Sequence, residues 1–155
     1  MVVIDTDVLL LAFAFQADAR QADNTRFLQE VQTDSPAITV YTLMELLGKL
    51  SFNLTPDRLD HWQSWLIAAY QLETIWPAAP NTAVTYLSWH EILFSRPFNR
   101  MKAVKMPYMD ALILDLAEQV QANCFVTWNA RHFRGKSTLP VMTPGEYLAN
   151  QPAPT

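Results

Sequence analysis

Three short runs of apolar residues, each too short to form a helix of usual length, place the strongest constraint on how this chain can fold. They span residues 2–4, 37–40 and 124–127, and a weaker run follows at 141–142. Segments with helical character lie between them, at 8–15, 20–32, 43–52, 56–71, 81–94 and 108–122. Short apolar strands that alternate with helices are typical of a parallel sheet whose two faces are covered. The sequence therefore predicts an α/β layered fold with a mainly parallel sheet.

Capping residues indicate where some of these segments begin and end. Thr55 and Pro56 are a typical helix start, with threonine as the cap and proline in the first turn. Asn123 is expected to end the last long helix in the left-handed conformation. A chain of 155 residues is the usual size of one domain. We therefore expect one domain over residues 1–149, followed by a flexible tail at 150–155 that contains two prolines.

Composition excludes several classes of protein. The single cysteine, Cys124, lies in an apolar run, so we expect a buried hydrophobic residue rather than a nucleophile or half of a disulfide. The three histidines lie far apart with no cysteine cluster beside them, which argues against a zinc site. The three glycines form no phosphate-binding loop and no dinucleotide fingerprint. The first residues lack the basic residues and the longer apolar run of a signal peptide, and the longest apolar stretch, 8–15, is too short to cross a bilayer, so we expect a cytoplasmic protein without membrane contact.

Charge is distributed unevenly along the chain. The net charge of −4 by itself argues against a nucleic-acid partner. However, residues 1–95 hold four basic and eleven acidic side chains, whereas residues 96–136 hold seven basic and three acidic ones. This asymmetry is consistent with a basic rim beside an acidic centre, and equally with ordinary surface charge.

The basic stretch begins with a segment, 95–107, that we predict to be a loop. It combines four cations with one aromatic side chain, Phe98. Such a mixture is able to bind phosphates and to stack a base, although a solvated loop without function is an equally good interpretation. The candidate phosphate-binding residues are Arg96, Arg100, Lys102 and Lys105.

Three acidic residues are expected at one edge of the predicted sheet. Asp5 directly follows the first apolar run, Glu45 lies near the start of the helix after the second, and Asp110 opens the helix at 108–122. In an open parallel sheet, ligand sites lie beyond the carboxyl ends of the strands. Each acid also has a purely structural interpretation. Asp5 suits a turn and Asp110 suits a helix start, while Glu45 would form a capping box with Thr42.

Asp110 gives the strongest individual signal for a functional role. The residues three, four and seven positions after it are apolar, so Asp110 heads the face of its helix that is directed at the core. Asp115 instead lies on the polar face of the same helix and is expected to be solvated. A carboxylate that points into the core needs a partner, because burying an unpaired charge is costly. A bound cation would supply that partner.

Carboxylates that cluster without basic partners repel one another, so three of them at one edge indicate a hard cation. All-oxygen ligands favour Mg²⁺ or Mn²⁺. The usual chemistry of such sites is phosphodiester hydrolysis, in which the metal activates water and stabilises the leaving oxygen. Thr127 and Asn129 follow the third apolar run and add neutral oxygens at the same edge, or serve only as turn residues. Asp7 is either a further acid of the site or the cap of the helix near Val8.

Five short motifs occur in order along nearly the whole chain. They read Val-Ile-Asp5-Thr-Asp7-Val-Leu, Ile-Thr-Val-Tyr-Thr-Leu-Met-Glu45-Leu-Leu, Met-Asp110-Ala-Leu-Ile-Leu-Asp-Leu-Ala, Val-Thr-Trp-Asn129-Ala-Arg-His-Phe133 and Val-Met-Thr-Pro-Gly-Glu-Tyr-Leu. Each motif is weak alone, but the ordered set is fairly specific. Together they resemble the PIN-domain family, and especially the VapC-like ribonuclease toxins of bacterial toxin–antitoxin pairs.

This resemblance implies a three-layer α/β/α sandwich around a parallel sheet, with Mg²⁺-dependent cleavage of RNA as the activity. It also implies a homodimer that is restrained by an antitoxin protein. The implied metal-binding acids are Asp5, Glu45 and Asp110. The implied supporting residues are Thr127 and Asn129. Arg131, within the fourth motif, joins the candidate RNA-contacting residues.

The fourth motif departs from the family at one position. The family often carries an aspartate where this chain has His132. The histidine would contact metal, water or phosphate, or else lie on the surface without a role. The change puts a second metal in question and, to a lesser degree, catalysis itself, unless Asp7 compensates. Two alternatives to a nuclease are a catalytically weak PIN-fold module that binds RNA or a protein, and a structural domain whose acids are only caps.

Overall fold

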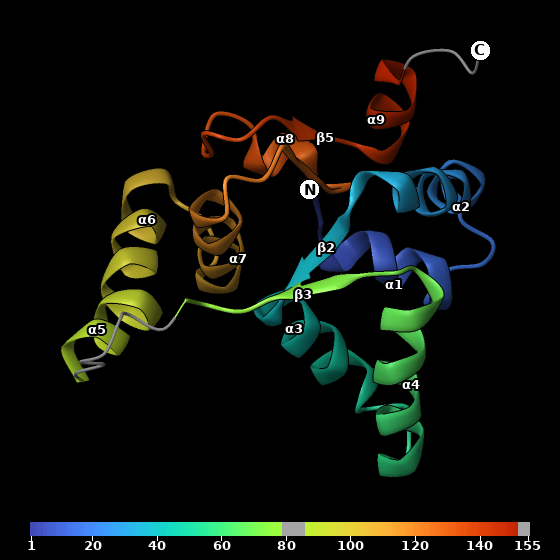
Figure 1. The fold of residues 1–155 in the computed structure, drawn as a ribbon, viewed down its shortest axis with the longest axis horizontal. Coiled ribbons are helices and arrows are strands. Elements are labelled where there is room, and N and C mark those ends of the chain that lie inside the picture. The colour runs from blue at the N-terminus through green and yellow to red at the C-terminus, as the bar shows by residue number, and fades with distance from the viewer. Residues whose placement is uncertain (79–85, 152–155) are drawn as a thin grey trace.

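A computed structural model describes residues 1–78 and 86–151 of the chain (Figure 1). Its strands form one sheet in the order β3-β2-β1-β4-β5, and every neighbouring pair is parallel. The strands are β1 (Val2–Ile4), β2 (Pro36–Thr39), β3 (Glu73–Ile75), β4 (Cys124–Val126) and β5 (Val141–Met142). The predicted parallel sheet is therefore confirmed.

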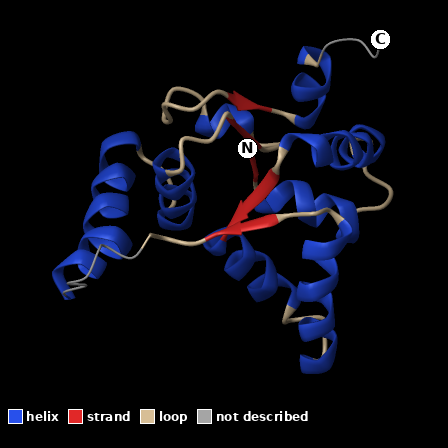
Figure 2. Ribbon diagram, in the orientation of Figure 1, coloured by secondary structure: helices blue, strands red, loops and turns tan. Residues whose placement is uncertain are grey.

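Helices connect these strands and make up most of the described chain (Figure 2). Before β4 come α1 (Thr6–Ala14), α2 (Gln21–Glu30), α3 (Val40–Leu50), α4 (Pro56–Ala69), α5 (Tyr86–His90), α6 (Arg96–Val104) and α7 (Tyr108–Gln119). After β4 come α8 (Ala130–Phe133) and α9 (Pro144–Asn150). A 3₁₀ turn (Val31–Asp34) extends α2, and a π-helical turn (Glu91–Ser95) joins α5 to α6. Parallel strands require such long connections, because the chain must return to the same end of the sheet.

Alternating side chains of the central strands divide the core into two layers. On β1, Val2 and Ile4 pack on one face of the sheet and Val3 packs on the other. The first face is covered by α1, α2, α4 and α9, and the second by α7 (Figure 1). A strand buried on both faces is what a uniformly apolar run predicts. The three-layer α/β/α sandwich is thus confirmed, and α6 packs on the outer side of α7 rather than on the sheet.

Helix α3 begins three residues earlier than predicted, and this changes the role of Glu45. The cap is Thr39, whose hydroxyl accepts a hydrogen bond from the backbone N–H of Thr42 at 3.0 Å. The predicted capping box between Thr42 and Glu45 is therefore wrong. Strand β2 runs directly into α3, so no turn residue marks the boundary in the sequence. Glu45 lies inside the helix, where its carboxylate is able to contact α1.

The segment 95–107, predicted to be a loop, is mostly helical. Helix α6 has Pro97 in its first turn, directly after the π-helical turn, and the carbonyl of Leu93, which Pro97 cannot serve as a donor, accepts a hydrogen bond from the hydroxyl of Tyr108. Met101 and Val104 pack toward the core on the α7 side. The loop prediction is wrong because α6 packs an apolar face against the neighbouring helix. This packing stabilises α6 by more than its charged residues and proline destabilise it.

The remaining differences concern element ends. Helix α7 is followed by Gln121 in the left-handed conformation (φ 54°), so the predicted left-handed residue Asn123 is two positions too late. Strand β3 and helices α8 and α9 are absent from the sequence-based prediction. Helix α9 begins with a complete capping box between Thr143 and Glu146, a signal that the sequence does contain. Helix α4 does begin at Pro56, as predicted.

Parts of two predicted segments lie outside the described residues. These are the beginning of the helix predicted at 81–94 and the last four residues of the tail predicted at 150–155. The described part of the first forms α5 and the π-helical turn, and Asn150 belongs to α9. The division into one domain and a tail stays a prediction.

The expectation for Cys124 agrees with the structure. Cys124 is buried, and burial raises the pKa of its thiol to about 11, which suits a hydrophobic role and not a nucleophilic one. Among the helices that the structure describes, none is long and apolar enough to cross a membrane.

Candidate active site

The candidate acids lie where the order of the strands changes direction. From β1 the chain proceeds to β2 and β3 on one side of the sheet, whereas β4 and β5 lie on the other side. Connections after β1 and β4 therefore diverge, and a ligand site is expected beyond the carboxyl ends of these two strands. The backbone N–H of Asp5 donates to the carbonyl of Val126 at 3.0 Å, which holds the two strand ends side by side.

Asp5 is the most deeply buried of the predicted acids, with 7% of the residue exposed. It caps α1 by accepting a hydrogen bond from the backbone N–H of Thr6 at 2.7 Å. Burial raises the pKa of Asp5 well above its ordinary value, and the charges of Asp7 and Asp110 raise it further. The hydroxyl of Thr127 and the N–H of Thr6 partly oppose this increase. Within the described part of the chain, Asp5 has no ion-pair partner.

Asp110 lies in the first turn of α7 and faces His132 of α8. Asp110 Oδ2 and His132 Nε2 are 3.3 Å apart, without the geometry of a hydrogen bond. Burial raises the pKa of Asp110, His132 lowers it, and the charge of Glu45 raises it. Lys49 and Lys136 are near enough to lower it further. The structure therefore brings the histidine of the fourth motif beside a predicted acid.

Glu45 reaches the same edge from α3. Its Oε2 accepts a hydrogen bond from the hydroxyl of Thr6 at 2.7 Å, and its Oε1 is 2.7 Å from Nζ of Lys49. Thr6 is buried between the two acids of the first motif, so this bond ties α3 to α1. Sequence reasoning missed Thr6 and Lys49, although the position of Thr6 between Asp5 and Asp7 was a signal. The three predicted acids thus share one edge of the sheet.

Asp7 does not cap its helix, because that position belongs to Asp5. Its carboxylate instead turns toward the loop after β4. Oδ1 accepts from the backbone N–H of Trp128 at 3.2 Å, and Oδ2 accepts from the N–H of Asn129 and the hydroxyl of Thr127, both at 3.0 Å. Burial raises the pKa of Asp7 and these bonds lower it. Asp7 therefore holds the loop that carries the fourth motif.

The residues at this edge carry donor atoms that suit a metal ion, but as placed they do not form a complete set of ligands. Across residues 1–78 and 86–151, no three acidic, histidine or cysteine side chains stand close enough to form a metal site as placed. The available donors are carboxylate oxygens, which suit a hard divalent cation. Burial raises the pKa of both Asp5 and Asp110, and a cation near them would offset this effect by favouring the charged carboxylates. Glu45 would exchange its contact with Lys49 for the metal.

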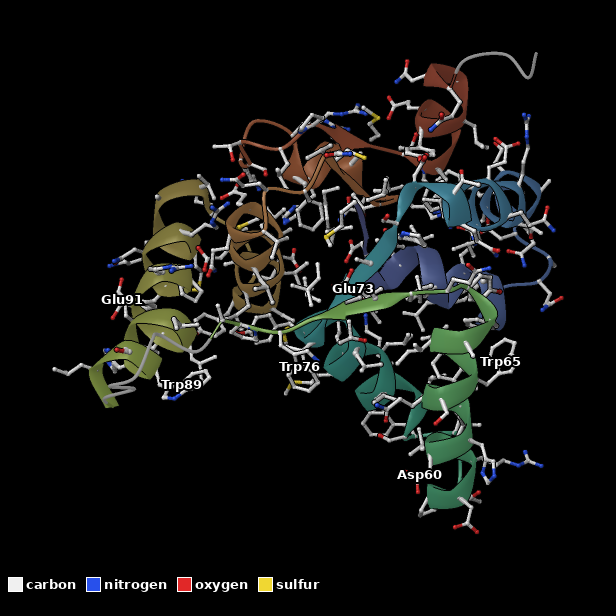
Figure 3. All side chains as sticks on the ribbon, viewed as in Figure 1. Asp60, Trp65, Glu73, Trp76, Trp89 and Glu91 are labelled. Carbon is white, nitrogen blue, oxygen red and sulfur yellow. The ribbon has the colours of Figure 1, made fainter. Side chains whose placement is uncertain are left out.

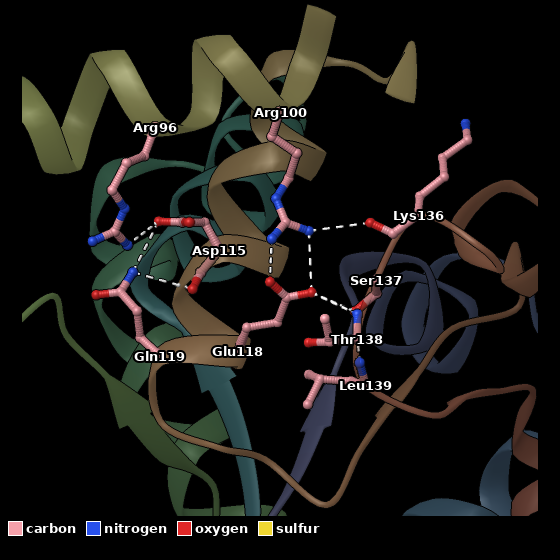
Figure 4. A network of polar contacts seen from close by, with 9 residues as sticks. All are labelled: Arg96, Arg100, Asp115, Glu118, Gln119, Lys136, Ser137, Thr138 and Leu139. Carbon is pink, nitrogen blue, oxygen red and sulfur yellow. Dashed lines mark hydrogen bonds and ion pairs between the residues drawn. The ribbon is translucent and has the colours of Figure 1, made fainter. Parts of the chain in front are cut away.

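Two of the predicted RNA-binding cations are engaged within the protein. Arg96 and Arg100 project from α6 toward α7 and form ion pairs with Asp115 and Glu118 (Figure 4). The predicted solvation of Asp115 is wrong, because its side chain is paired and only 16% exposed. These ion pairs hold α6 against α7, so the two guanidinium charges are already compensated.

The other basic residues lie nearer the acids or on the outer surface. Lys102 is exposed and stacks over Phe98, at 4.5 Å from the ring centre. Lys105 ends α6, and its carbonyl accepts a hydrogen bond from Nζ of Lys136 at 3.2 Å. Arg131 is exposed on α8. Sequence reasoning missed Lys136, which belongs to the basic stretch and lies near Asp110.

Comparisons with known proteins identify the fold. No protein-family model matches the sequence, and no curated protein matches it. Among solved structures, VapBC2 from Rickettsia felis, bound to a DNA fragment from its promoter, superposes with a TM-score of 0.66 at 17% identity, over 92% of this chain and 98% of that one. The fold is PIN-like. A toxin–antitoxin complex from Klebsiella pneumoniae (TM-score 0.60, 19% identity, 93% and 98% covered) and FitAcB from Neisseria gonorrhoeae (0.63, 14%, 94% and 99%) agree.

At the level of the fold, this structural similarity confirms the resemblance that was drawn from the five motifs. It extends over nearly the full length of each chain compared, so the architectures correspond almost throughout. At these identities the likeness concerns architecture, and the chemistry has to be argued from the residues of this chain.

Proposed function

We propose that this protein is a metal-dependent endoribonuclease that acts in the cytoplasm as the toxin of a toxin–antitoxin pair. The observation that carries the proposal is the convergence of Asp5, Glu45 and Asp110 at the carboxyl edge of a PIN-like sheet, with Asp5 buried and without a counter-charge. Support for the biological setting comes from the solved structures with this fold, one of which is a toxin–antitoxin complex.

In this proposal the three acids hold one Mg²⁺ or Mn²⁺, which would activate water and neutralise charge on the cleaved phosphodiester. The chain's own residues prepare the site. Thr6 orients Glu45 by its 2.7 Å hydrogen bond, and Asp7 fixes the loop after β4 through three hydrogen bonds. Lys49 offsets the charge of Glu45 when no metal is bound.

The first prediction is that RNA cleavage requires added metal. Purified protein should cut single-stranded RNA with Mg²⁺ or Mn²⁺ and should stop in EDTA, because three carboxylates without a cation would repel the phosphate. Fluorescent-RNA cleavage with a dialysed preparation measures this. Asp110→Asn protein purified in parallel is the control for contaminating ribonuclease. If the wild type cleaved RNA as fast in EDTA as with metal, and the Asp110→Asn protein did not cleave it, a metal mechanism would be contradicted.

One observation favours the second candidate, a PIN-fold module that binds RNA or protein with weak or no cleavage. His132 stands at the position of a family acid and contacts Asp110, so the acidic set has one member fewer than the family's. RNA binding without cleavage at saturating Mn²⁺ would decide for this module.

A surface for the proposed antitoxin lies on α1 and α4. Phe13 contacts three aromatic rings edge-on, those of Trp62, Trp65 and Tyr70. Trp65, which is labelled in Figure 3, is 49% exposed. It borders a pocket of about 750 Å³. The pocket is lined by Leu54, Asp57, Arg58, His61, Trp62 and Trp65. An exposed aromatic patch with a polar rim is typical of a protein-docking surface, so an apolar segment of the antitoxin suits it.

The second prediction tests this surface. Trp65→Ala should weaken binding of the proposed antitoxin by at least about tenfold, because a central tryptophan often carries much of the binding energy. Trp89→Ala is the matched control, since Trp89 is also exposed but lies on α5, across the molecule in Figure 3. Calorimetric titration gives both affinities. Equal effects of the two substitutions would contradict the assignment.

The homodimer stays a prediction.

A further inference from the structure

We propose that a pocket beside the acidic centre binds a phosphate group of the RNA strand, next to the phosphate that is cleaved; this rests on the proposed ribonuclease function. The pocket has a volume of about 320 Å³. It is lined by Asn129, Arg131, His132 and Lys136. All four belong to α8, its cap or the loop that follows, and none is acidic.

The lining side chains carry hydrogen-bond donors without carboxylate hydrogen-bond partners. Arg131 is exposed and forms no ion pair within the described residues. Lys136 donates to the carbonyl of Lys105, which leaves two of the three donors of its ammonium group for a ligand. His132 lines the pocket, but its buried Nε2 lies 3.3 Å from Asp110 Oδ2, so Arg131 and Lys136 supply the charged donors for a ligand. An oxyanion with several acceptor oxygens fits such a set of donors.

The position of the pocket indicates why the ligand is a phosphate of the substrate. His132 both lines the pocket and lies 3.3 Å from Asp110, so the pocket adjoins the proposed metal-binding acids. A strand whose cleaved phosphate reaches those acids carries a neighbouring phosphate close to them, and the carboxylates alone would repel it. The cations of Arg131 and Lys136 offset that repulsion.

The loop that carries Lys136 is held by the polar network in Figure 4. Arg100 donates to the carbonyl of Lys136 at 3.2 Å and is paired with Glu118. Glu118 also accepts from the hydroxyl of Ser137 at 2.8 Å and from the N–H of Thr138 at 2.9 Å. Arg100 and Glu118 are therefore positioning residues of the pocket, and Arg100 acts through the backbone of Lys136 instead of touching RNA.

The test measures binding of a short fluorescein-labelled single-stranded RNA by anisotropy in EDTA, where turnover does not interfere. Arg131→Ala and Lys136→Met should each raise the Kd severalfold at low salt. Each should also flatten the slope of log affinity against log salt by about 0.7, because one phosphate contact is lost. Arg26→Ala is the matched control, because Arg26 is also exposed but lies on α2, where it pairs with Glu30. Its slope should equal that of the wild type.

The positioning role is tested separately by Glu118→Gln, which keeps the size of the side chain and removes its charge. It should weaken RNA binding when made alone and add nothing to Lys136→Met, because it acts through Lys136. A merely structural role would instead lower the affinity of both backgrounds by the same factor, and that result would overturn the positioning assignment.

Inorganic phosphate distinguishes a strand phosphate from a free one. Phosphate should displace the RNA from wild-type protein more strongly than chloride does at equal ionic strength, and this advantage should disappear in Lys136→Met. Phosphate that binds in the pocket without displacing RNA would assign the pocket to a free ion and overturn its role in RNA binding.

Cleavage measured in parallel separates this inference from the nuclease proposal. Normal cleavage combined with unchanged salt slopes in Arg131→Ala and Lys136→Met would overturn the pocket and leave the ribonuclease standing. Flattened slopes in a protein that does not cleave RNA with any divalent metal would support phosphate binding and overturn the ribonuclease.

Discussion

Asp110→Asn should lower the single-turnover rate of RNA cleavage by at least about a hundredfold, which corresponds to about 2.7 kcal/mol in the activation barrier. The asparagine keeps the shape of the side chain but removes the negative charge that a hard cation requires. His132→Ala should cost less by more than about tenfold, or 1.4 kcal/mol. The imidazole contacts Asp110 and the phosphate pocket but is not one of the proposed metal-binding acids.

The control for this comparison is Asp115→Asn on the same helix. Asp115 pairs with Arg96 on the α6 side, so its replacement tests the loss of one aspartate from α7 outside the acidic centre. Single-turnover cleavage at saturating Mg²⁺, with circular dichroism to confirm folding, gives the three rates. Equal losses in His132→Ala and Asp110→Asn would make His132 a primary catalytic residue and would contradict the three-acid site.

Asp5→Asn should stabilise the metal-free protein, and Asp7→Asn should destabilise it, although the two residues are neighbours in the first motif. Asp5 is buried without a counter-charge, and an asparagine is still able to accept the cap bond from Thr6, so the substitution should gain on the order of 1 kcal/mol. Asp7 accepts from three donors with two oxygens, and an asparagine would turn its NH₂ group toward one of them. The loss should be about 1–3 kcal/mol.

The pH dependence of the Asp5→Asn difference has a definite sign. Because burial raises the pKa of Asp5 in the folded state, the native protein binds this proton more tightly than the unfolded chain does. As the pH falls through the raised pKa, the free energy of unfolding of the wild type should therefore increase relative to that of the variant. This increase should be complete near the ordinary pKa of 3.8. The advantage of Asp5→Asn should be full above the raised pKa and should shrink in acid.

Thermal melts of the wild type and both variants, with and without Mg²⁺, measure these effects. Added Mg²⁺ should raise the melting temperature of the wild type by mass action and that of Asp5→Asn much less. If Asp5→Asn were less stable than the wild type at neutral pH and Mg²⁺ had no differential effect, Asp5 would be a cap residue and not part of a metal site.

Local sequence determined the central strands and the position of two acids. The apolar runs at 2–4 and 124–127 could only be buried on both faces, so they became β1 and β4 at the centre of a parallel sheet. Chain direction then placed Asp5 at the carboxyl edge, because a residue that follows a strand must leave from that end. The core-facing position of Asp110 could be predicted from the 3.6-residue period of its helix, which puts Asp110 and the apolar stripe on one face.

Only the tertiary structure decided the roles that depend on partners far along the chain. Asp7 and Thr127 are separated by 120 residues, and Arg100 and the carbonyl of Lys136 by 36. No local pattern reports which way such a side chain turns, because its direction is set by the donors and acceptors that packing brings near it. The same reason explains α6: charge and proline favoured a loop, but the apolar contact with α7 stabilised a helix and turned two arginines toward α7.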